Sequence, residues 1–213
     1  MKTNLSIKLF IAAVFVLPLS LYALISFYEN KIQSLPVLGK SVEINGKEIQ
    51  HRIADFTFTD QDGNTYSNKD WGNKIVVADF FFTRCPSICP KMTNSLKEVR
   101  NAYINDPDIL INSITVDPGN DDATVLKTYA KKSGINSADW KLLTGDKKEI
   151  YKLARNSFFV TTTDGDGGPG DFIHSEKLIL IDQQRRIRGY YSGTDSNEVS
   201  QLIQDIKKLK NEN

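Results

Sequence analysis

The stretch Lys74-Ile-Val-Val-Ala-Asp-Phe-Phe-Phe82 decides the fold, together with Thr83-Arg-Cys-Pro-Ser-Ile-Cys-Pro90 that follows it. Residues 74–82 are almost continuously apolar and rich in β-branched and aromatic side chains, which is typical of a strand buried on both faces. Apolar residues at helical spacing come after the two cysteines and predict a helix over residues 91–103. We therefore expect a buried strand, a cysteine-containing loop and a helix in direct succession.

Apolar patterns outside this unit predict the remaining elements. Turn signals at Asn45-Gly46 and Asp62-Gly63 predict two hairpins before the buried strand. Further strands are expected at 109–116, 140–143, 177–182 and 187–191, and helices at 124–132, 147–154 and 196–210. Alternation of strand and helix requires a mainly parallel core, and the closing hairpin adds an antiparallel edge. We expect an α/β, thioredoxin-like fold: a central mixed sheet flanked by helices, with an N-terminal β-hairpin extension.

The composition narrows the chemistry that this chain can perform. Its 27 Lys and Arg residues nearly balance 26 Asp and Glu residues, so no strongly basic field exists and no nucleic-acid partner is expected. Two cysteines cannot build a disulfide-rich scaffold or a four-cysteine zinc site. Chemistry with a thiol or a soft metal must therefore pass through very few residues.

An apolar segment near the N-terminus predicts a membrane anchor. Residues 9–27 carry no charge, and a membrane-spanning helix needs about 20 apolar residues. A cleaved signal peptide is the alternative, but its apolar region is about 7–15 residues long and ends in a small-x-small site. Leu21 stands where such a site needs a small residue. We expect an uncleaved transmembrane helix at residues 9–28.

The chain is then expected to have four parts. Residues 1–8 form a short cytoplasmic tail, 9–28 the transmembrane anchor, 29–40 a tether and 41–213 the thioredoxin-like domain. The positive-inside bias across the anchor is slight, and a short internal tail with a large exported domain is the simpler topology. The expected location is the bacterial inner membrane in a single pass, with the C-terminal domain facing the periplasm or the cell exterior.

The two cysteines form the candidate site. Cys85 and Cys89 stand where the buried strand ends and the helix begins. The partial positive charge of a helix N-terminus favours thiolate over thiol, and Arg84 adds a cation. A spacing of four residues brings both sulfurs to one side of the first turn. The pair can therefore close a reversible disulfide or bind a soft metal, whereas a merely structural disulfide across so short a loop would stabilise little.

The two histidines have different expected roles. Soft thiolates select Cu(I), and an added imidazole suits both copper oxidation states. His51, between Gln50 and Arg52, is expected to be a solvated surface residue. His174 comes shortly before the strand expected at 177–182, whose entrance faces the cysteine helix in thioredoxin-like folds. His174 is therefore the candidate third ligand.

On these motifs the chain resembles the Sco/SenC family of copper-binding, thioredoxin-like proteins that help to assemble the copper site of cytochrome c oxidase. The matching segments are Phe81-Phe-Thr-Arg-Cys-Pro-Ser-Ile-Cys-Pro90, Val116-Asp-Pro118, Trp140-Lys-Leu-Leu-Thr-Gly145 and Asp171-Phe-Ile-His-Ser175. The resemblance covers about residues 50–210 and implies that Cys85, Cys89 and His174 bind copper as Cu(I) or Cu(II). Ile173 departs from the often acidic residue of the family, which leaves Asp171 as a candidate partner of His174.

Two functions are open at this point. The first is a metallochaperone that delivers copper to the cytochrome c oxidase subunit with a dinuclear copper centre, with other copper carriers or thiol–disulfide proteins as further partners. The second is a membrane-tethered thiol–disulfide oxidoreductase in which Cys85 and Cys89 are the redox-active catalytic pair and reduce target cysteines. His174 favours the first, because a pure oxidoreductase does not need it. A redox thioredoxin also has two residues between its cysteines, whereas this chain has three.

Overall fold

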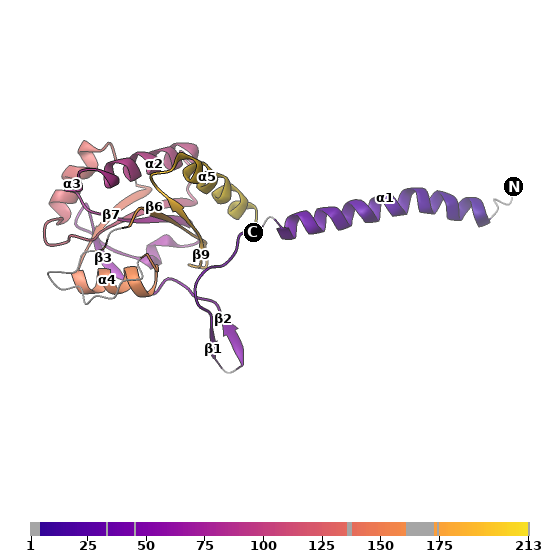
Figure 1. Ribbon diagram of the computed structural model, residues 1–213, viewed down its shortest axis with the longest axis horizontal. Helices are drawn as coiled ribbons and strands as arrows, with labels where there is room; N and C mark the ends of the chain where they lie inside the picture. The colour runs from indigo at the N-terminus through magenta and orange to yellow at the C-terminus, as the bar shows by residue number, and fades with distance from the viewer. Residues whose placement is uncertain are drawn as a thin grey trace.

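Figure 1 shows the computed structural model, which describes residues 5–32, 34–44, 46–135, 138–160, 173 and 175–212. Its main sheet contains the strands β3 (Thr57–Asp60), β4 (Thr65–Ser67), β5 (Ile75–Phe81), β6 (Ile109–Thr115), β7 (Trp140–Thr144), β8 (Lys177–Ile181) and β9 (Ile187–Ser192). Their spatial order is β4-β3-β7-β6-β5-β8-β9, so the cysteine-bearing strand β5 lies inside the sheet. The strands β5, β6 and β7 are parallel, and β3, β4, β8 and β9 join by antiparallel pairing. The predicted mixed sheet is confirmed.

Helices cover both faces of this sheet. They are α2 (Ile88–Ala102), α3 (Ala123–Lys132), α4 (Lys147–Asn156) and α5 (Ser196–Asn211), and a short 3-10 helix, η1 (Asn68–Trp71), follows β4. The sequence pattern did not predict η1, and α2 begins three residues before the predicted start at residue 91. This earlier start includes Pro90 in the first turn, where a helix residue has no N–H partner within the helix and proline is tolerated.

Side chains of β5 alternate between two hydrophobic cores. Val77 and Phe81 pack with residues from α2, α3 and α5, whereas Val76 and Phe80 pack with residues from α4 and from residues 53–58. Figure 1 shows α2, α3 and α5 on one side of the sheet and α4 on the other. Every residue of β5 is buried, because helices or loops cover both faces.

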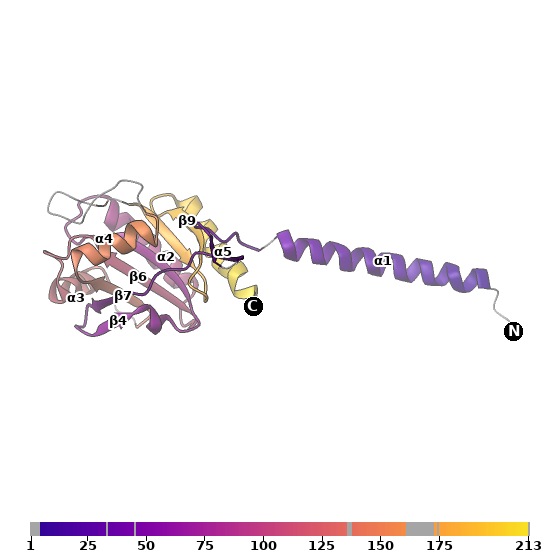
Figure 2. The ribbon, with the colours of Figure 1, turned by 90° about the horizontal axis from the view of Figure 1, so that it is seen from below.

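The N-terminal part lies outside this sheet. The strands β1 (Val42–Ile44) and β2 (Lys47–Ile49) form an antiparallel hairpin of their own, which confirms the predicted extension. The helix α1 (Leu5–Ile32) extends away from the domain in both ribbon views (Figures 1 and 2). In the part of the chain that the structure describes, no helix reaches the length and apolar character that a membrane crossing needs. The transmembrane helix expected at residues 9–28 is therefore not confirmed.

A buried arginine fastens the residues after α1 to the end of the domain. Only 3% of the Arg188 side chain is exposed, and it pairs with Asp182 at 3.1 Å and Glu212 at 2.6 Å. The same guanidinium donates to the carbonyl oxygen of Leu35 at 2.5 Å and to that of Pro36 at 3.1 Å. Arg188 thus joins β9, the end of α5 and the segment that leads into the domain.

Replacing Arg188 by methionine should destabilise the protein by about 3–5 kcal/mol, because it leaves carboxylates in this cluster without their cation. Urea unfolding followed by circular dichroism measures the difference. Lys127→Met is the matched control, since Lys127 and Asp62 form an exposed ion pair that contributes less than about 1 kcal/mol. Equal stabilities of the two variants would contradict the structural role assigned to Arg188.

Candidate functional site

The two cysteines lie together at the carboxyl end of β5. A turn closed by the Cys85 N–H and the Phe82 carbonyl oxygen, 3.3 Å apart, leads from the strand to α2. Cys89 is buried in the first turn of α2, whereas Cys85 is only half-buried in the loop before it. The Cys89 backbone N–H donates to the Cys85 sulfur at 3.3 Å. Both thiols are free, and their proximity matches the prediction from their spacing.

The pKa values of the two thiols are shifted in opposite directions. Partial burial acts against ionisation of Cys85, but hydrogen bonds from the Cys89 thiol and from the backbone N–H groups of Cys89, Ser87 and Ile88 outweigh it and lower the pKa of Cys85. Burial, reinforced by the neighbouring Cys85, raises the pKa of Cys89 to about 12. Cys85 is therefore the thiol that ionises more readily, and Cys89 stays protonated to higher pH.

A buried carboxyl group belongs to the surroundings of the cysteines. Asp79 is 2% exposed and lies on β5, with its Oδ1 atom unpartnered among the described residues. Burial raises the pKa of Asp79 to about 7, although a hydrogen bond with Ser113 acts in the opposite direction. When ionised, Asp79 adds to the effects that raise the pKa of Cys89. The sequence pattern of an apolar strand gave no sign of this acid's influence.

The loop between β6 and α3 holds the residues that precede Cys85. Asp117 accepts a hydrogen bond from Arg84 at 2.9 Å, and Asp121 accepts from the backbone N–H and the hydroxyl of Thr83 at 3.0 and 2.5 Å. The segment 116–118 was recognised in the sequence, but nothing singled out Asp121. The parallel pairing of β5 and β6 brings this loop to the cysteines, because both strands end at the same edge of the sheet.

The histidine expected to complete the site, His174, lies outside the described residues, as does Asp171. Ile173 is described: it is 3% exposed, and its N–H donates to the Tyr151 hydroxyl at 3.4 Å. Within the described part of the chain, no group of three His, Cys, Asp or Glu residues is arranged to hold a metal ion. Within this part of the chain, Cys85 and Cys89 are the two soft donors that lie together.

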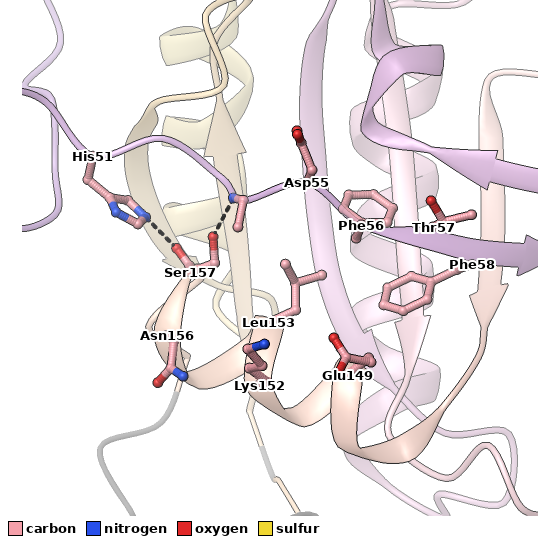
Figure 3. Close-up of a pocket in the computed structure, with 11 residues that line it drawn as sticks. His51, Asp55, Phe56, Thr57, Phe58, Glu149, Lys152, Leu153, Asn156 and Ser157 are labelled. Atoms are coloured by element: carbon pink, nitrogen blue, oxygen red, sulfur yellow. Dashed lines mark hydrogen bonds between the residues drawn. The ribbon is translucent and has the colours of Figure 1, made fainter.

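His51 lies in a different place from the cysteines and is not a solvated surface residue. Figure 3 shows it at the rim of a pocket of about 380 Å³ between residues 51–58 and α4. Its Nε2 atom is 2.8 Å from the Ser157 carbonyl oxygen, and its ring packs against Phe159 with centroids 4.6 Å apart. The expectation of a solvated residue was wrong, because tertiary packing brings the end of α4 against this histidine.

The family model for SCO1/SenC proteins matches residues 45–211. The chain belongs to the SCO1/SenC family. Among solved structures, a SCO1/SenC family lipoprotein from Bacillus anthracis is 31% identical, with a TM-score of 0.67 over 75% of this chain and 95% of that one. BsSco, described as a cytochrome c oxidase assembly protein with a disulfide switch, is 29% identical with a TM-score of 0.65 over 76% and 94% of the two chains. Copper-bound ScoI of Bradyrhizobium japonicum is 26% identical, with a TM-score of 0.59 over 73% and 98%.

The SCO1/SenC relatives share a fold and a link to copper and cytochrome c oxidase assembly. The matching structures share the mixed sheet with flanking helices, and members with copper bound are among them. The family takes part in cytochrome c oxidase assembly and copper binding.

The buried carboxyl group predicts a pH dependence of stability in this SCO1/SenC protein. The pKa of Asp79 is about 7 in the folded state and roughly 3.9 in an unfolded chain, so both states are protonated below about pH 4. Between these values the unfolded state loses its proton first, and the contribution of Asp79 to stability falls as the pH rises, by up to about 4 kcal/mol at pH 8. In Asp79→Asn this decrease in the free energy of unfolding should disappear. Urea unfolding at pH 5 and pH 8 measures the decrease, and an equal pH dependence in variant and parent would contradict the raised pKa of Asp79.

Proposed function

We propose that this protein is a membrane-anchored copper chaperone that assists assembly of the dinuclear copper centre of cytochrome c oxidase. The cysteine pair carries the proposal: one thiol of lowered pKa and one buried thiol adjoin each other at the start of α2. Soft sulfur donors select Cu(I), and copper-bound relatives with the same fold support copper as the cargo. The copper-site subunit of the oxidase is the proposed recipient.

The proposed copper ligands are Cys85, Cys89 and His174. Two thiolates bind Cu(I) but leave Cu(II) short of the nitrogen donors that it prefers. His174 is the proposed source of that nitrogen. Its immediate neighbour Ile173 is buried and bonded to Tyr151, whose hydroxyl donates to the Val116 carbonyl oxygen at 2.9 Å. Val116 directly follows β6, and its N–H donates to the carbonyl oxygen of Phe81, the last residue of β5, at 2.8 Å.

A thiol–disulfide oxidoreductase is the second candidate, and one observation favours it. An accessible thiol of lowered pKa next to a buried thiol of raised pKa is an arrangement suited to attack and release of a mixed disulfide. BsSco, a member of the family, is described as having a disulfide switch, which supports this candidate. In this reading, reduced Cys85 attacks a target disulfide and Cys89 then resolves the mixed disulfide, so that the target leaves with two thiols and this pair becomes oxidised.

The proposal includes attachment to the bacterial inner membrane by residues 9–28, with the domain on the outer side. The uncharged run at residues 9–27 supports it. Alkaline extraction of cell membranes tests the attachment: the full chain should stay in the membrane pellet, and its release into the supernatant would refute it.

The oxidation state of the cysteines should control copper binding. The reduced protein should bind one Cu(I), whereas the protein with a Cys85–Cys89 disulfide should bind none at that site, because a disulfide offers no thiolate. Anaerobic titration against a chromogenic Cu(I) chelator measures the stoichiometry. Cys85→Ser and Cys89→Ser should each lose the site. Equal stoichiometry in the oxidised and reduced protein would refute the shared site.

Removal of the proposed nitrogen ligand separates the two functions. His174→Ala should weaken Cu(II) binding by at least about 10–100-fold, weaken Cu(I) binding less, and leave disulfide formation almost unchanged. Absorption in the thiolate-to-Cu(II) charge-transfer region reports the site, and circular dichroism controls for folding. His51→Ala is the control histidine variant, since His51 lies in the pocket beside α4. A folded His174→Ala protein with an unchanged copper spectrum would favour the plain oxidoreductase.

A further inference from the structure

The fully buried carboxylate of Asp121 accepts hydrogen bonds from Thr83, two residues before Cys85. Asp121 has no exposed surface, and it accepts three hydrogen bonds. Two come from Thr83: the backbone N–H bonds to Oδ2 at 3.0 Å and the hydroxyl to Oδ1 at 2.5 Å. The third comes from the Thr115 hydroxyl, 2.5 Å from Oδ2. Asp121 thereby joins the cysteine loop to the end of β6.

The loop that carries Asp121 is itself well braced. The carbonyl oxygen of Asp117 accepts the backbone N–H groups of Asn120 and Asp121, both at 2.9 Å. The Asn120 amide also donates to the carboxylate of Asp117, at 2.9 and 3.1 Å to its two oxygens. Asp122 then caps α3 by accepting from the N–H of Val125 at 2.8 Å. Asp121 therefore projects from a rigid support rather than from a free loop.

The hydrogen bonds from Thr83 to Asp121 restrain the turn that positions the Cys85 sulfur. Thr83 and Arg84 are the two central residues of the turn from Phe82 to Cys85. Asp121 holds the first of them, and Asp117 holds the second through the ion pair with Arg84. These two contacts differ in their exposure to solvent. The Arg84 side chain that pairs with Asp117 is exposed, whereas the Asp121 carboxylate that binds Thr83 is buried. A hydrogen bond is electrostatically stronger inside a protein than in water, so we expect the bonds to Asp121 to be the stronger restraint.

We propose that Asp121 is a positioning residue that acts through Thr83 to hold Cys85 over the start of α2, in the arrangement that binds copper. Its two acceptor oxygens match the two donors of Thr83, one from the backbone and one from the side chain. Together the two bonds restrain both the Thr83 peptide and its side chain. Cys85 then meets the incoming ion without first ordering the loop, which makes binding tighter. This inference rests on the copper function proposed above.

Substitutions at the two threonines separate positioning from stability. Thr83→Val removes the hydroxyl bond on the cysteine side of Asp121, and Thr115→Val removes the bond to the same carboxylate on the β6 side. The two exchanges are chemically identical, and Thr83→Ser restores the lost hydroxyl. Asp121→Asn reduces the acceptor oxygens from two to one, and its effect should not add to that of Thr83→Val, because both act on one interaction.

Two measurements on the reduced full-length protein test the proposal. Thr83→Val should weaken Cu(I) binding roughly tenfold in competition with a chromogenic chelator, whereas Thr115→Val and Thr83→Ser should change it less than about threefold. In copper-free protein at pH 7, alkylation of Cys85 by iodoacetamide should slow by about threefold in Thr83→Val alone, as its sulfur leaves the N–H groups of α2. Thermal unfolding of each variant is the control for folding.

The outcomes distinguish this proposal from the copper function. Unchanged copper affinity and alkylation in Thr83→Val, or equal losses in Thr83→Val and Thr115→Val, would overturn the role of Asp121. If the parent protein binds no copper, the chaperone function fails, and the alkylation rates still decide whether Asp121 positions Cys85. A selective loss in Thr83→Val, reversed in Thr83→Ser, would support the proposal.

Discussion

The contact between the Cys85 sulfur and the backbone N–H groups at the start of α2 is the interaction on which the site depends. Those N–H groups have no partner within a helix, so they are free to bind an anion. The Cys85 sulfur can accept these hydrogen bonds only if β5 ends beside the start of α2 and the turn at residues 82–85 keeps its conformation. The buried sheet fixes the first condition, and the loop with Asp117 and Asp121 fixes the second.

The asymmetry between the cysteines follows from this arrangement. Cys85, in the loop, has its pKa lowered by N–H donors, whereas Cys89 belongs to the core beside Met92 and has its pKa raised by burial. A pair of this kind loses its first proton more readily than an ordinary pair of thiols, and keeps its second until a metal or a disulfide partner binds the sulfur. Both proposed functions, copper binding and thiol exchange, therefore depend on the same structural feature.

The segment that follows α1 is attached to the domain by a buried ion-pair cluster. Arg188 is buried among carboxylates and backbone carbonyl groups, and it joins residues 35 and 36 to the end of α5. The Leu38 N–H adds a backbone bond to Ile187 at 2.8 Å. The chain that enters the domain after α1 is thus attached at residues 35–38, within the range 29–40 that was predicted to be a tether.

The sequence by itself determined the order of strands and helices, the hairpin extension and the cysteine pair, because each follows from local patterns: apolar periodicity, turn residues and spacing along one helix. It also indicated the family through short motifs. It could not show the pairing of Asp121 with Thr83, since these residues are separated by 38 positions and meet only when β5 and β6 lie side by side. Nor could it show the influence of Asp79, on β5, on Cys89, in α2, which depends on how the strand and the helix pack. His51 shows the same limit: a polar context predicted exposure, and packing against α4 decided otherwise. Local pattern fixes which elements form, whereas pKa values and positioning contacts depend on burial and on long-range neighbours that only the tertiary structure supplies.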